Sequence, residues 1–259
     1  MPPRLLALPL CLLRALLAAS AFALFGLGGL LVSLLLLLIP SRRAALATVR
    51  FTWRLFAGYM RLTGLIRVHA DALPQPSGAI IVANHPSLID VVLLIALLPR
   101  TTCLVKDALR HNPFVGIIVR RVFLSQDASL LDHAPAWLAA GNNLLIFPEG
   151  TRTPVDAPPP PGRPAAAPYL PLPLLPFHRG PAQLAIRTGA PIQPIQIRVT
   201  SHILGKKQFP LAVGAIPCHY HFTALPVVSP PAPAPAALPP HALARSLTDR
   251  LRALLSSQT

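Results

Sequence analysis

An uncharged, apolar run near the N-terminus constrains this chain more than any other feature. No charged residue occurs between Ala15 and Ile39, and about 25 residues in a helix span roughly 37 Å, enough to cross the hydrocarbon core of a bilayer. A cleavable signal peptide would have a shorter apolar region and a small-residue cleavage site. We therefore expect an uncleaved membrane anchor over residues 1–41, in which the central glycines could permit a kink or a helical hairpin.

The charge distribution indicates an orientation and a class of partner. The chain has 23 Lys and Arg against 8 Asp and Glu, a formal net charge of +15, and 53% hydrophobic residues. Basic residues are denser after the apolar run than before it, so the positive-inside rule places the following domain in the cytoplasm, on the inner (cytoplasmic) membrane. Anionic membrane phospholipids suit such a surface. Aromatic residues are only 6% of the chain, which disfavours the stacking platforms of nucleic-acid-binding proteins.

The segment over residues 42–68 has an amphipathic pattern. Aromatic residues and leucines such as Phe51, Trp53 and Leu55 interleave with arginines such as Arg50 and Arg54. This composition is typical of a helix that lies in the headgroup plane of a membrane. The alternative is a helix that packs on the core and exposes an arginine edge to solvent.

The rest of the chain alternates short apolar runs with helical patterns, which predicts an α/β domain over residues 69–228. Runs typical of strands occupy residues 78–83, 101–106, 119–124, 144–147 and 191–199, and residues 209–228 could supply two more. Helical patterns occupy residues 88–98, 107–119, 129–140 and 180–188. Prolines crowd residues 156–176, which predicts a surface loop, and residues 229–259 are expected to form a Pro/Ala linker and a terminal helix.

The sequence NHPSLID follows the first apolar run of this domain and precedes a helical pattern. His85 therefore lies at a strand-to-helix turn, with Asp90 five residues later. A neutral imidazole can take a proton from a hydroxyl group, and a carboxylate can fix its tautomer and stabilise the imidazolium that forms. The alternative is a capping box, in which Ser87 caps the helix and Asp90 reaches back to it.

A second polar motif, FPEGTR, follows the apolar run at residues 144–147. Its Glu149 is the only glutamate in the chain, which suggests a positioned carboxylate. Arg152 offers a planar fork of donors that suits phosphate or carboxylate. Gly150 and Thr151 can turn backbone amides and a hydroxyl toward the same anion. The alternative is a tight turn held by a Glu–Arg ion pair.

Neither cysteine nor histidine spacing predicts a metal site. Cys11, Cys103 and Cys218 are far apart and lack CxxC spacing, and the nine histidines include no HExxH pattern. We therefore expect neither a zinc site nor a disulfide framework.

The two motifs together resemble those of the glycerophospholipid acyltransferase family, which includes 1-acyl-sn-glycerol-3-phosphate O-acyltransferases. That family carries an NHxSxxD block followed by an FPEGTRS block, each at the end of a strand. The segment from Val105 to Gly116 and the residues around Phe177 and Pro194 are similar to further family segments. The resemblance covers roughly residues 65–199. It implies a mixed α/β sheet flanked by helices, preceded here by the transmembrane and membrane-surface helices.

The resemblance also implies a role for each motif residue. His85 is the base that deprotonates the acceptor hydroxyl, and Asp90 orients it. The acceptor's glycerol and phosphate end is held by Glu149, Gly150, Thr151 and Arg152. The turn around the base is shaped by Asn84 and Ser87. Lys106 is a candidate for contact with an anionic group of either substrate.

The activity that follows from the resemblance is transfer of a fatty acyl group from acyl-CoA or acyl carrier protein to a lysophospholipid hydroxyl. The leading acceptor is 1-acylglycerol-3-phosphate, which would give phosphatidic acid. No metal or prosthetic group is needed, since the acyl thioester is a co-substrate. Another lyso-lipid, such as a lyso-ornithine lipid, is the alternative acceptor.

Two departures from the family pattern concern the acceptor. Gln126 stands where the family usually has an arginine, a charge that Arg120 or Arg121 could replace, and the third block reads FPEGTRT, with Thr153 in place of serine.

Two other functions stay open on the residues alone. A thioesterase or lipase would need a nucleophilic serine, and no GxSxG occurs. A non-catalytic module that binds membranes or carrier protein would need neither His85 nor Asp90.

Overall fold

The computed structural model describes most of the chain. The described residues are 4–70, 73–113, 115–126, 130–154, 169–170, 172–201, 204, 216–231 and 239–257, without the side chains of residues 4–11 and 131. Most of the predicted proline-rich loop, the centre of the predicted linker and the first of the two strands expected within residues 209–228 lie outside these residues.

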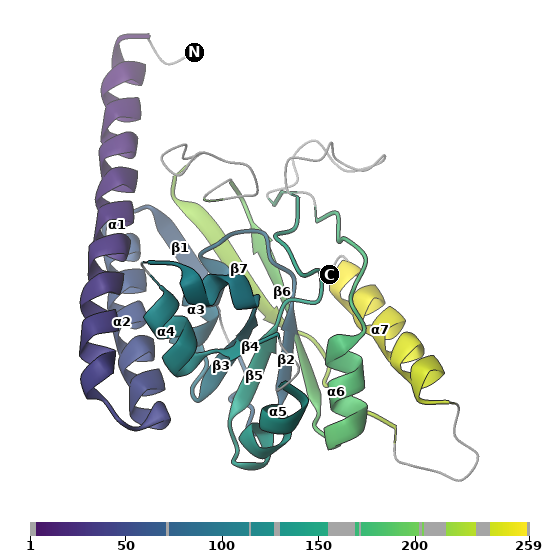
Figure 1. Cartoon of the computed structure of the whole chain (residues 1–259). Helices are drawn as coiled ribbons and strands as arrows, with labels where there is room; N and C mark the ends of the chain where they lie inside the picture. Colours follow the sequence, from purple (N-terminus) through teal and green to yellow (C-terminus); the bar gives the residue numbers. More distant parts are fainter. Residues whose placement is uncertain are drawn as a thin grey trace.

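A seven-stranded sheet with the order β1-β7-β6-β2-β5-β3-β4 forms the centre of the fold (Figure 1). Neighbouring strands are parallel except β6 and β7, which are antiparallel. The sheet is therefore mixed, as expected. The strands are β1 Ile66–His69, β2 Ile80–Ala83, β3 Thr101–Val105, β4 Leu124–Ser125, β5 Asn143–Ile146, β6 Ile192–Val199 and β7 Cys218–Ala224.

The central strand β2 explains why the sheet is covered on both sides. All four of its residues are buried, and successive side chains of a strand point to opposite faces. Ile81 and Ala83 join one hydrophobic cluster, whereas Ile80 and Val82 join the other. A parallel strand with two apolar faces must be covered by helices on both.

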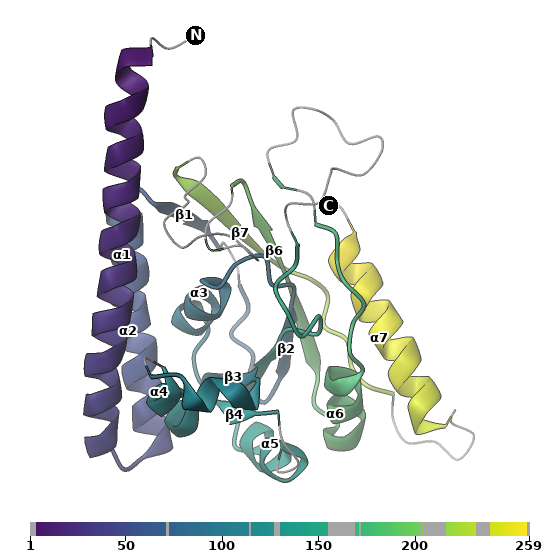
Figure 2. The ribbon, with the colours of Figure 1, turned by 45° about the horizontal axis from the view of Figure 1, so that its top comes forward.

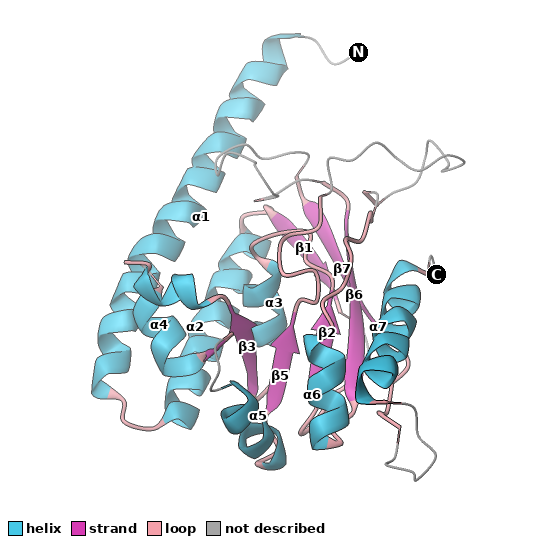
Figure 3. Cartoon of the chain, turned by 45° about the vertical axis from the view of Figure 1, so that its right-hand side comes forward, coloured by secondary structure: helices cyan, strands magenta, loops and turns pink. Residues whose placement is uncertain are grey.

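The helices form two layers, one on each face of the sheet (Figure 3). One layer consists of α1 Arg4–Leu38, α2 Arg42–Leu62, α3 Asp90–Leu97 and α4 Gly116–Val122. The other consists of α5 Leu130–Ala139, α6 Gly180–Thr188 and α7 Pro240–Ser256. A 3₁₀ helix, η1 Asp107–His111, precedes α4.

The predicted anchor is a single helix. Helix α1 continues through the central glycines, so they introduce no hairpin, and it runs antiparallel beside α2 (Figures 1 and 2). Within it, Leu12–Leu38 is a candidate membrane span, because a window of 18 residues there has a mean hydropathy of 2.5 and only 17% of that window is buried. The N-terminal part of α1 projects beyond the rest of the chain (Figure 1).

Helix α2 presents two apolar stripes. Ala45, Val49 and Trp53 are buried against the core, as the core-packing alternative requires. Phe51 and Leu55 are nevertheless 62% and 59% exposed, which leaves a second stripe for a membrane surface. The core-packing interpretation is therefore confirmed for the buried stripe, and contact of the exposed stripe with a membrane surface stays a prediction.

The expectation of a helix as far as residue 68 is wrong. Helix α2 ends at Leu62, and Leu65 donates its N–H to the carbonyl of Met60 at 3.0 Å, while Gly64 has a φ of 72°. This is a left-handed glycine C-cap, a local signal that the amphipathic pattern obscured. Residues Ile66–His69 then form β1 at the edge of the sheet.

The strand predicted at residues 119–124 is also wrong in most of its length. Helix α4 continues to Val122, and β4 is only Leu124–Ser125. Ile118, Val119 and Val122 are buried in the cluster that packs on α1 and α2. The β-branched run looked like a strand, but its packing against two helices overrides that weak preference. The helix predicted at 107–119 is correspondingly split into η1 and α4.

Candidate active site

The two motifs meet at the carboxyl ends of the neighbouring parallel strands β2 and β5. Asn84 and His85 follow β2, and Pro148 and Glu149 come soon after the end of β5. The chain leaves β2 toward β3 on one side, and it returns from β5 to β6 on the other side of β2. In α/β sheets, such a change of direction opens a crevice at the carboxyl ends of the strands, where ligands bind.

His85 and Asp90 form a hydrogen-bonded pair. Nδ1 of His85 lies 2.9 Å from Oδ2 of Asp90, and the two side chains are 13% and 0% exposed. The ring of His85 stacks on Phe147 at 4.1 Å between centroids. Because Nδ1 is engaged by the carboxylate, Nε2 is the nitrogen that can take a proton from a substrate.

The same carboxylate also organises the start of α3. Oδ2 of Asp90 accepts the N–H of Ser87 at 2.7 Å, and Oγ of Ser87 accepts the N–H of Ile89 at 3.3 Å. Helix α3 begins at Asp90, and its N-cap residue Ile89 makes no side-chain cap bond. Of the predicted capping box, the bond from the N–H of Ser87 to the side chain of Asp90 is therefore present. It uses the same oxygen of Asp90 that bonds to His85.

Burial raises the pKa of Asp90, and its neighbours oppose that rise. The hydrogen bond and the charge of His85, the N–H of Ser87 and the positive charge of Arg152 each lower the pKa of Asp90. Arg152 therefore lies within electrostatic reach of the pair. Oδ1 of Asp90 has no hydrogen-bond partner among the described residues.

Asn84 fixes the point where the chain turns away from the sheet. Its Nδ2 donates to the carbonyl of Ile197 at 2.8 Å, and its Oδ1 accepts the N–H of Ile197 at 2.7 Å. The side-chain amide thus extends the hydrogen bonding between β2 and β6 by one position beyond the end of strand β2. His85, the next residue, is held at a defined place by this bond pair.

Glu149 lies beneath the site rather than at its opening. It is 4% exposed, Oε1 accepts the hydroxyl of Thr153 and Oε2 accepts the N–H of Leu175 at 3.0 Å. Burial raises the pKa of Glu149, and the hydrogen bonds from Thr153, Leu175 and the backbone of His85 oppose the rise. Its contacts are those of a residue that holds loops together. A direct contact of Glu149 with the acceptor, which the resemblance implied, stays a prediction.

The turn after Glu149 brings the other predicted residues to the site. Gly150 has a φ of 62°, and a Cβ there would lie 2.9 Å from Nε2 of His178. Thr151 and Arg152 are both half-buried in this turn. One guanidinium nitrogen of Arg152 donates to the carbonyl of Leu204 at 2.9 Å.

The remaining cationic candidates lie farther away. Lys106 is exposed at the end of β3, which is two strands from β2. Arg121 donates to the carbonyl of Ile39 and Arg120 to that of Arg110. Both arginines therefore contact the backbone beside α1 and η1, and a role for either in supplying the charge that Gln126 lacks stays a prediction.

The sequence analysis assigned no role in the site to Thr153, Phe147 or Tyr220. The hydroxyl of Thr153 accepts the N–H of His85 at 3.1 Å. Serine, the usual family residue at this position, also carries a hydroxyl. Tyr220 is fully buried, and burial together with nearby Cys218 and Asp90 raises its pKa well above the usual value. The final threonine of FPEGTRT was the available signal for Thr153, whereas nothing local marked Tyr220.

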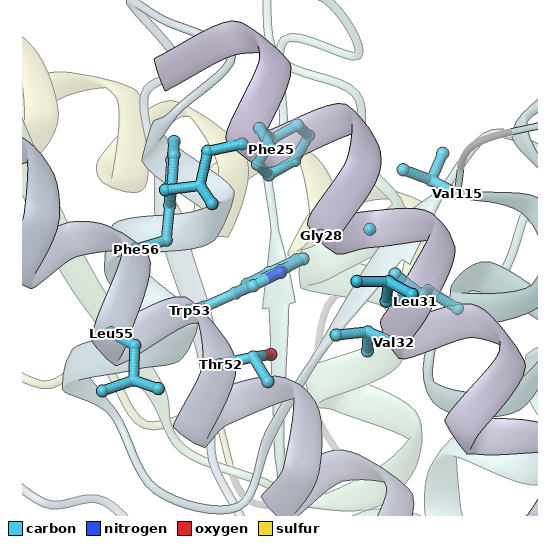
Figure 4. A pocket seen from close by; sticks show the side chains of 12 residues that line it. Phe25, Gly28, Leu31, Val32, Thr52, Trp53, Leu55, Phe56 and Val115 are labelled. Atoms are coloured by element: carbon cyan, nitrogen blue, oxygen red, sulfur yellow. The ribbon is translucent and has the colours of Figure 1, made fainter. Parts of the chain in front are cut away.

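An apolar pocket lies apart from the catalytic pair. It has a volume of about 300 Å³ and is lined by residues of α1 and α2 together with Val115 and Ile118. Phe25, Trp53 and Phe56 face it in Figure 4. None of its lining residues belongs to the two motifs, so this pocket is separate from the predicted catalytic pair.

A match to a family profile tests the resemblance to acyltransferases that the two motifs suggested. The sequence profile of the Acyltransferase family matches residues 65–198, just over half of the chain. The chain belongs to the Acyltransferase family. The match includes both motifs, the strands from β1 to β6 and all the described helices between them, so the matched part of the chain contains the candidate site.

Two curated members of acyltransferase type align with about half of the chain. A 1-acyl-sn-glycerol-3-phosphate acyltransferase from Cocos nucifera is 30% identical over 139 residues, which are 50% of this chain and 40% of that protein. A lyso-ornithine lipid O-acyltransferase from Pseudomonas aeruginosa is 34% identical over 139 residues, which are 51% of this chain and 46% of that protein. The alignment thus spans less than half the length of each relative.

A solved acyltransferase structure shares the whole fold. The 1-acyl-sn-glycerophosphate acyltransferase PlsC from Thermotoga maritima superposes with a TM-score of 0.61 and 21% identity, covering 96% of this chain and 97% of that chain. At this identity the likeness establishes the fold. The predicted family and fold class are therefore confirmed.

Proposed function

We propose that this chain is an O-acyltransferase that moves a fatty acyl group from a thioester to the free hydroxyl of a lysophospholipid. The observation that carries the proposal is the His85–Asp90 pair at the crevice of the sheet, with Arg152 close enough to affect the pKa of Asp90. A base and an anion-binding group at one place are what hydroxyl acylation of an anionic lipid needs.

The geometry supports a direct transfer. Nε2 of His85 takes the proton of the acceptor hydroxyl while the oxygen attacks the thioester carbonyl carbon. The tetrahedral intermediate collapses, the carbon–sulfur bond breaks, and the imidazolium returns its proton to the leaving thiolate. Asp90 stabilises the imidazolium between these steps through its 2.9 Å bond to Nδ1. These steps use no metal or prosthetic group, and acyl-CoA or acyl carrier protein serves as the co-substrate.

Arg152 is the proposed ligand of the acceptor's headgroup. It lies in the turn that follows Glu149 and contains the left-handed Gly150, and a guanidinium can form two parallel hydrogen bonds with phosphate. A phosphate acceptor such as 1-acylglycerol-3-phosphate, with phosphatidic acid as product, is therefore the leading substrate.

The membrane supplies this substrate in the proposed arrangement. Arg42 donates to the carbonyls of Val122 and Phe123, which places the α1–α2 turn beside the start of β4, at the amino ends of the parallel strands. The projecting end of α1 consequently lies on the side of their carboxyl ends, where His85 is (Figure 1). We propose that α1 anchors the domain in the inner membrane with the site on the cytoplasmic face, as the arginines after Ile39 favour.

A second acceptor has a specific observation in its favour. Gln126 removes a charge that the family pattern would place near the acceptor phosphate, and a lyso-ornithine lipid O-acyltransferase is among the relatives, at 34% identity. An ornithine headgroup carries a carboxylate, which Arg152 could also bind in bidentate fashion. Lyso-ornithine lipid is therefore the second candidate acceptor.

The decisive experiment is an acyl-transfer assay with purified protein in detergent. Labelled acyl-CoA or acyl carrier protein is offered with 1-acylglycerol-3-phosphate, lyso-ornithine lipid or lysophosphatidylcholine. We expect one acylated lyso-lipid product that disappears in His85→Ala and persists in His111→Ala, because His111 is exposed in η1. Equal product from His85→Ala would exclude His85 as the base. Thioester hydrolysis without any acceptor would instead support a thioesterase.

The acceptor site is tested separately. We expect Arg152→Ala to raise the KM for the acceptor far more than the KM for the acyl donor. Arg100→Ala serves as the matched control, since Arg100 is exposed at the opposite, amino-terminal end of β3. An effect of Arg152→Ala confined to the donor KM would show that the phosphate site is misassigned.

A further inference from the structure

Three histidines gather at the β1–β7 edge of the sheet: His69 from β1, and His219 and His221 from β7, about 150 residues later in the chain. In the parallel pairing of these strands, His69 lies opposite His221 and Arg67 lies opposite His219. Side chains at alternate positions of a strand share a face, and directly paired residues share it too. His69, His219 and His221 therefore project from the same face, opposite to the face on which Tyr220 is buried.

The three imidazoles are already close enough to share one ligand. Their nearest ring nitrogens all lie within 4.8 Å of one another, and Nε2 of His69 is 3.0 Å from Nδ1 of His219. The rings of His69 and His221 stack at 4.1 Å with an angle of 11°. Around a tetrahedral zinc ion the ligand nitrogens are about 3.3 Å apart, so small rotations of the side chains would suffice.

The donor set indicates the class of ion. Three neutral imidazoles suit zinc and the neighbouring divalent transition metals, whereas magnesium and calcium prefer oxygen ligands. Two histidines at alternate positions of one strand with a third on the next strand supply the His₃ set that some zinc enzymes use, with a fourth position left for water. Each of the three side chains is half-buried, so that solvent and ions reach them.

Two arginines lie beside the cluster: Arg67, which is paired with His219, and Arg198. Arg198 pairs with His221 across β6 and β7, and its guanidinium lies 5.2 Å from the ring centre of Tyr169, which meets His221 edge-on at 4.9 Å. A positive charge on this face disfavours a bare divalent ion but favours a small anion as the fourth ligand. The cluster is thus suited to an ion that completes its coordination from solvent.

We propose that His69, His219 and His221 form a site for a divalent transition metal ion, with zinc as the best match, that clamps β1 to β7. Strand β1 has four residues and, among the described strands, pairs with β7 alone, so it is a weakly held edge that joins helix α2 to the sheet. A metal bound by both strands binds the folded state only and stabilises it by mass action. The clamp also steadies Tyr220, the residue between two of the ligands, which lies close to Asp90 on the other face.

The test measures binding to the full-length chain after removal of any affinity tag and of bound metal with a chelator. Zinc is titrated by calorimetry, and cobalt is used as a probe because its visible absorption reports tetrahedral coordination. We expect one zinc ion per chain and a higher Tm with zinc. His69→Ala and His221→Ala should each lower zinc affinity by at least about tenfold, since even changes behind a metal ligand cost that much.

Matched variants keep the result interpretable. His111→Ala and His241→Ala remove exposed histidines elsewhere, and His85→Ala removes the catalytic base; all three should retain zinc binding. His221→Gln keeps a polar side chain at the edge strand without an imidazole ligand, and circular dichroism checks that it is folded. Absence of saturable zinc binding, or equal binding by folded His221→Gln and the unsubstituted protein, overturns the proposal. Loss of binding only in His85→Ala also overturns it.

Discussion

Thr153 and His85 are joined by two hydrogen bonds across 68 residues of sequence. The hydroxyl of Thr153 accepts the backbone N–H of His85 at 3.1 Å, and the N–H of Thr153 donates to the carbonyl of His85 at 2.7 Å. The hydroxyl also donates to buried Glu149. One threonine therefore fixes the loop of the base relative to the loop of Arg152, and the geometry of the site depends on it.

Replacing Thr153 by valine should destabilise the protein and slow catalysis. Valine has nearly the same shape, but it leaves the N–H of His85 and one oxygen of Glu149 without this partner. An unsatisfied buried polar group costs about 1–3 kcal/mol. The measurements are the free energy of unfolding and kcat for acyl transfer. Thr153→Ser should stay close to the unsubstituted protein, because serine keeps the hydroxyl; if valine and serine behave alike, the hydroxyl bridge is unimportant.

Replacing Asp90 by asparagine should reduce kcat far more than the KM for either substrate. The amide oxygen can still accept the N–H of Ser87 and the proton on Nδ1, but the amide carries no negative charge to stabilise the imidazolium. We expect a loss of about 10²–10⁴ in kcat, as for other orienting carboxylates. Asp107→Asn, at an exposed position in η1, is the control. A normal kcat in Asp90→Asn would mean that the carboxylate only caps the helix.

The raised pKa of Glu149 predicts how stability depends on pH. Its ordinary value is 4.5, and burial raises it in the folded state. As pH rises above the ordinary value, the unfolded chain loses this proton while the folded chain keeps it, so the free energy of unfolding falls. The fall stops once pH exceeds the raised pKa, and its slope is at most about 1.4 kcal/mol per pH unit.

Comparison with Glu149→Gln isolates this contribution. The glutamine does not titrate, whereas every other group is common to both proteins. We therefore expect the stability of the unsubstituted protein relative to Glu149→Gln to decrease as pH rises from about 4.5. Denaturant unfolding between pH 4 and 8 measures the difference. A relative stability that increases over this range would mean that the pKa of Glu149 is lowered by folding.

Substitution of Gly150 and of Gly189 by alanine distinguishes the cost of backbone strain from the cost of crowding at the site. Gly150 and Gly189 have φ angles of 62° and 69°, but only at Gly150 does a Cβ meet a neighbour, Nε2 of His178. Alanine in the left-handed region costs about 1–2 kcal/mol. We expect Gly189→Ala to show that cost alone and Gly150→Ala to show more, together with a raised acceptor KM. Thermal unfolding and kinetics measure both; equal effects would indicate that His178 simply moves aside.

Much of the fold was predictable because its signals are local. Helix α6 begins and ends where the helical pattern does, and β2, β5 and β6 differ from their predicted bounds by only a few residues. Their apolar runs bounded by glycine or proline leave few alternatives. The pattern was misleading at residues 119–122, where β-branched residues form α4 because two other helices bury them. The pattern was misleading again at Ile66–His69. These residues form a strand because they pair with β7, which comes much later in the chain.

The motifs of the candidate site were predicted from the sequence, but the contacts that join them to distant parts of the chain were not. His85 and Asp90 are five residues apart, so their pairing is a local property of a strand-to-helix turn. The burial of Glu149 and its bond to Leu175 depend on a segment that packs over the site from later in the chain. Tyr220 comes close to Asp90 only because β7 is placed at that side of the sheet.

The sequence by itself determined the apolar N-terminal helix, the alternation of strands and helices, and the two motifs that contain His85 and Arg152. These properties follow from residues within a few positions of one another. Only the tertiary structure decided that Thr153 would bond to His85, and that His69 would lie 3.0 Å from His219 across 150 residues. Such contacts are set by the order and register of the strands, because the sheet brings together whichever residues its pairing places side by side.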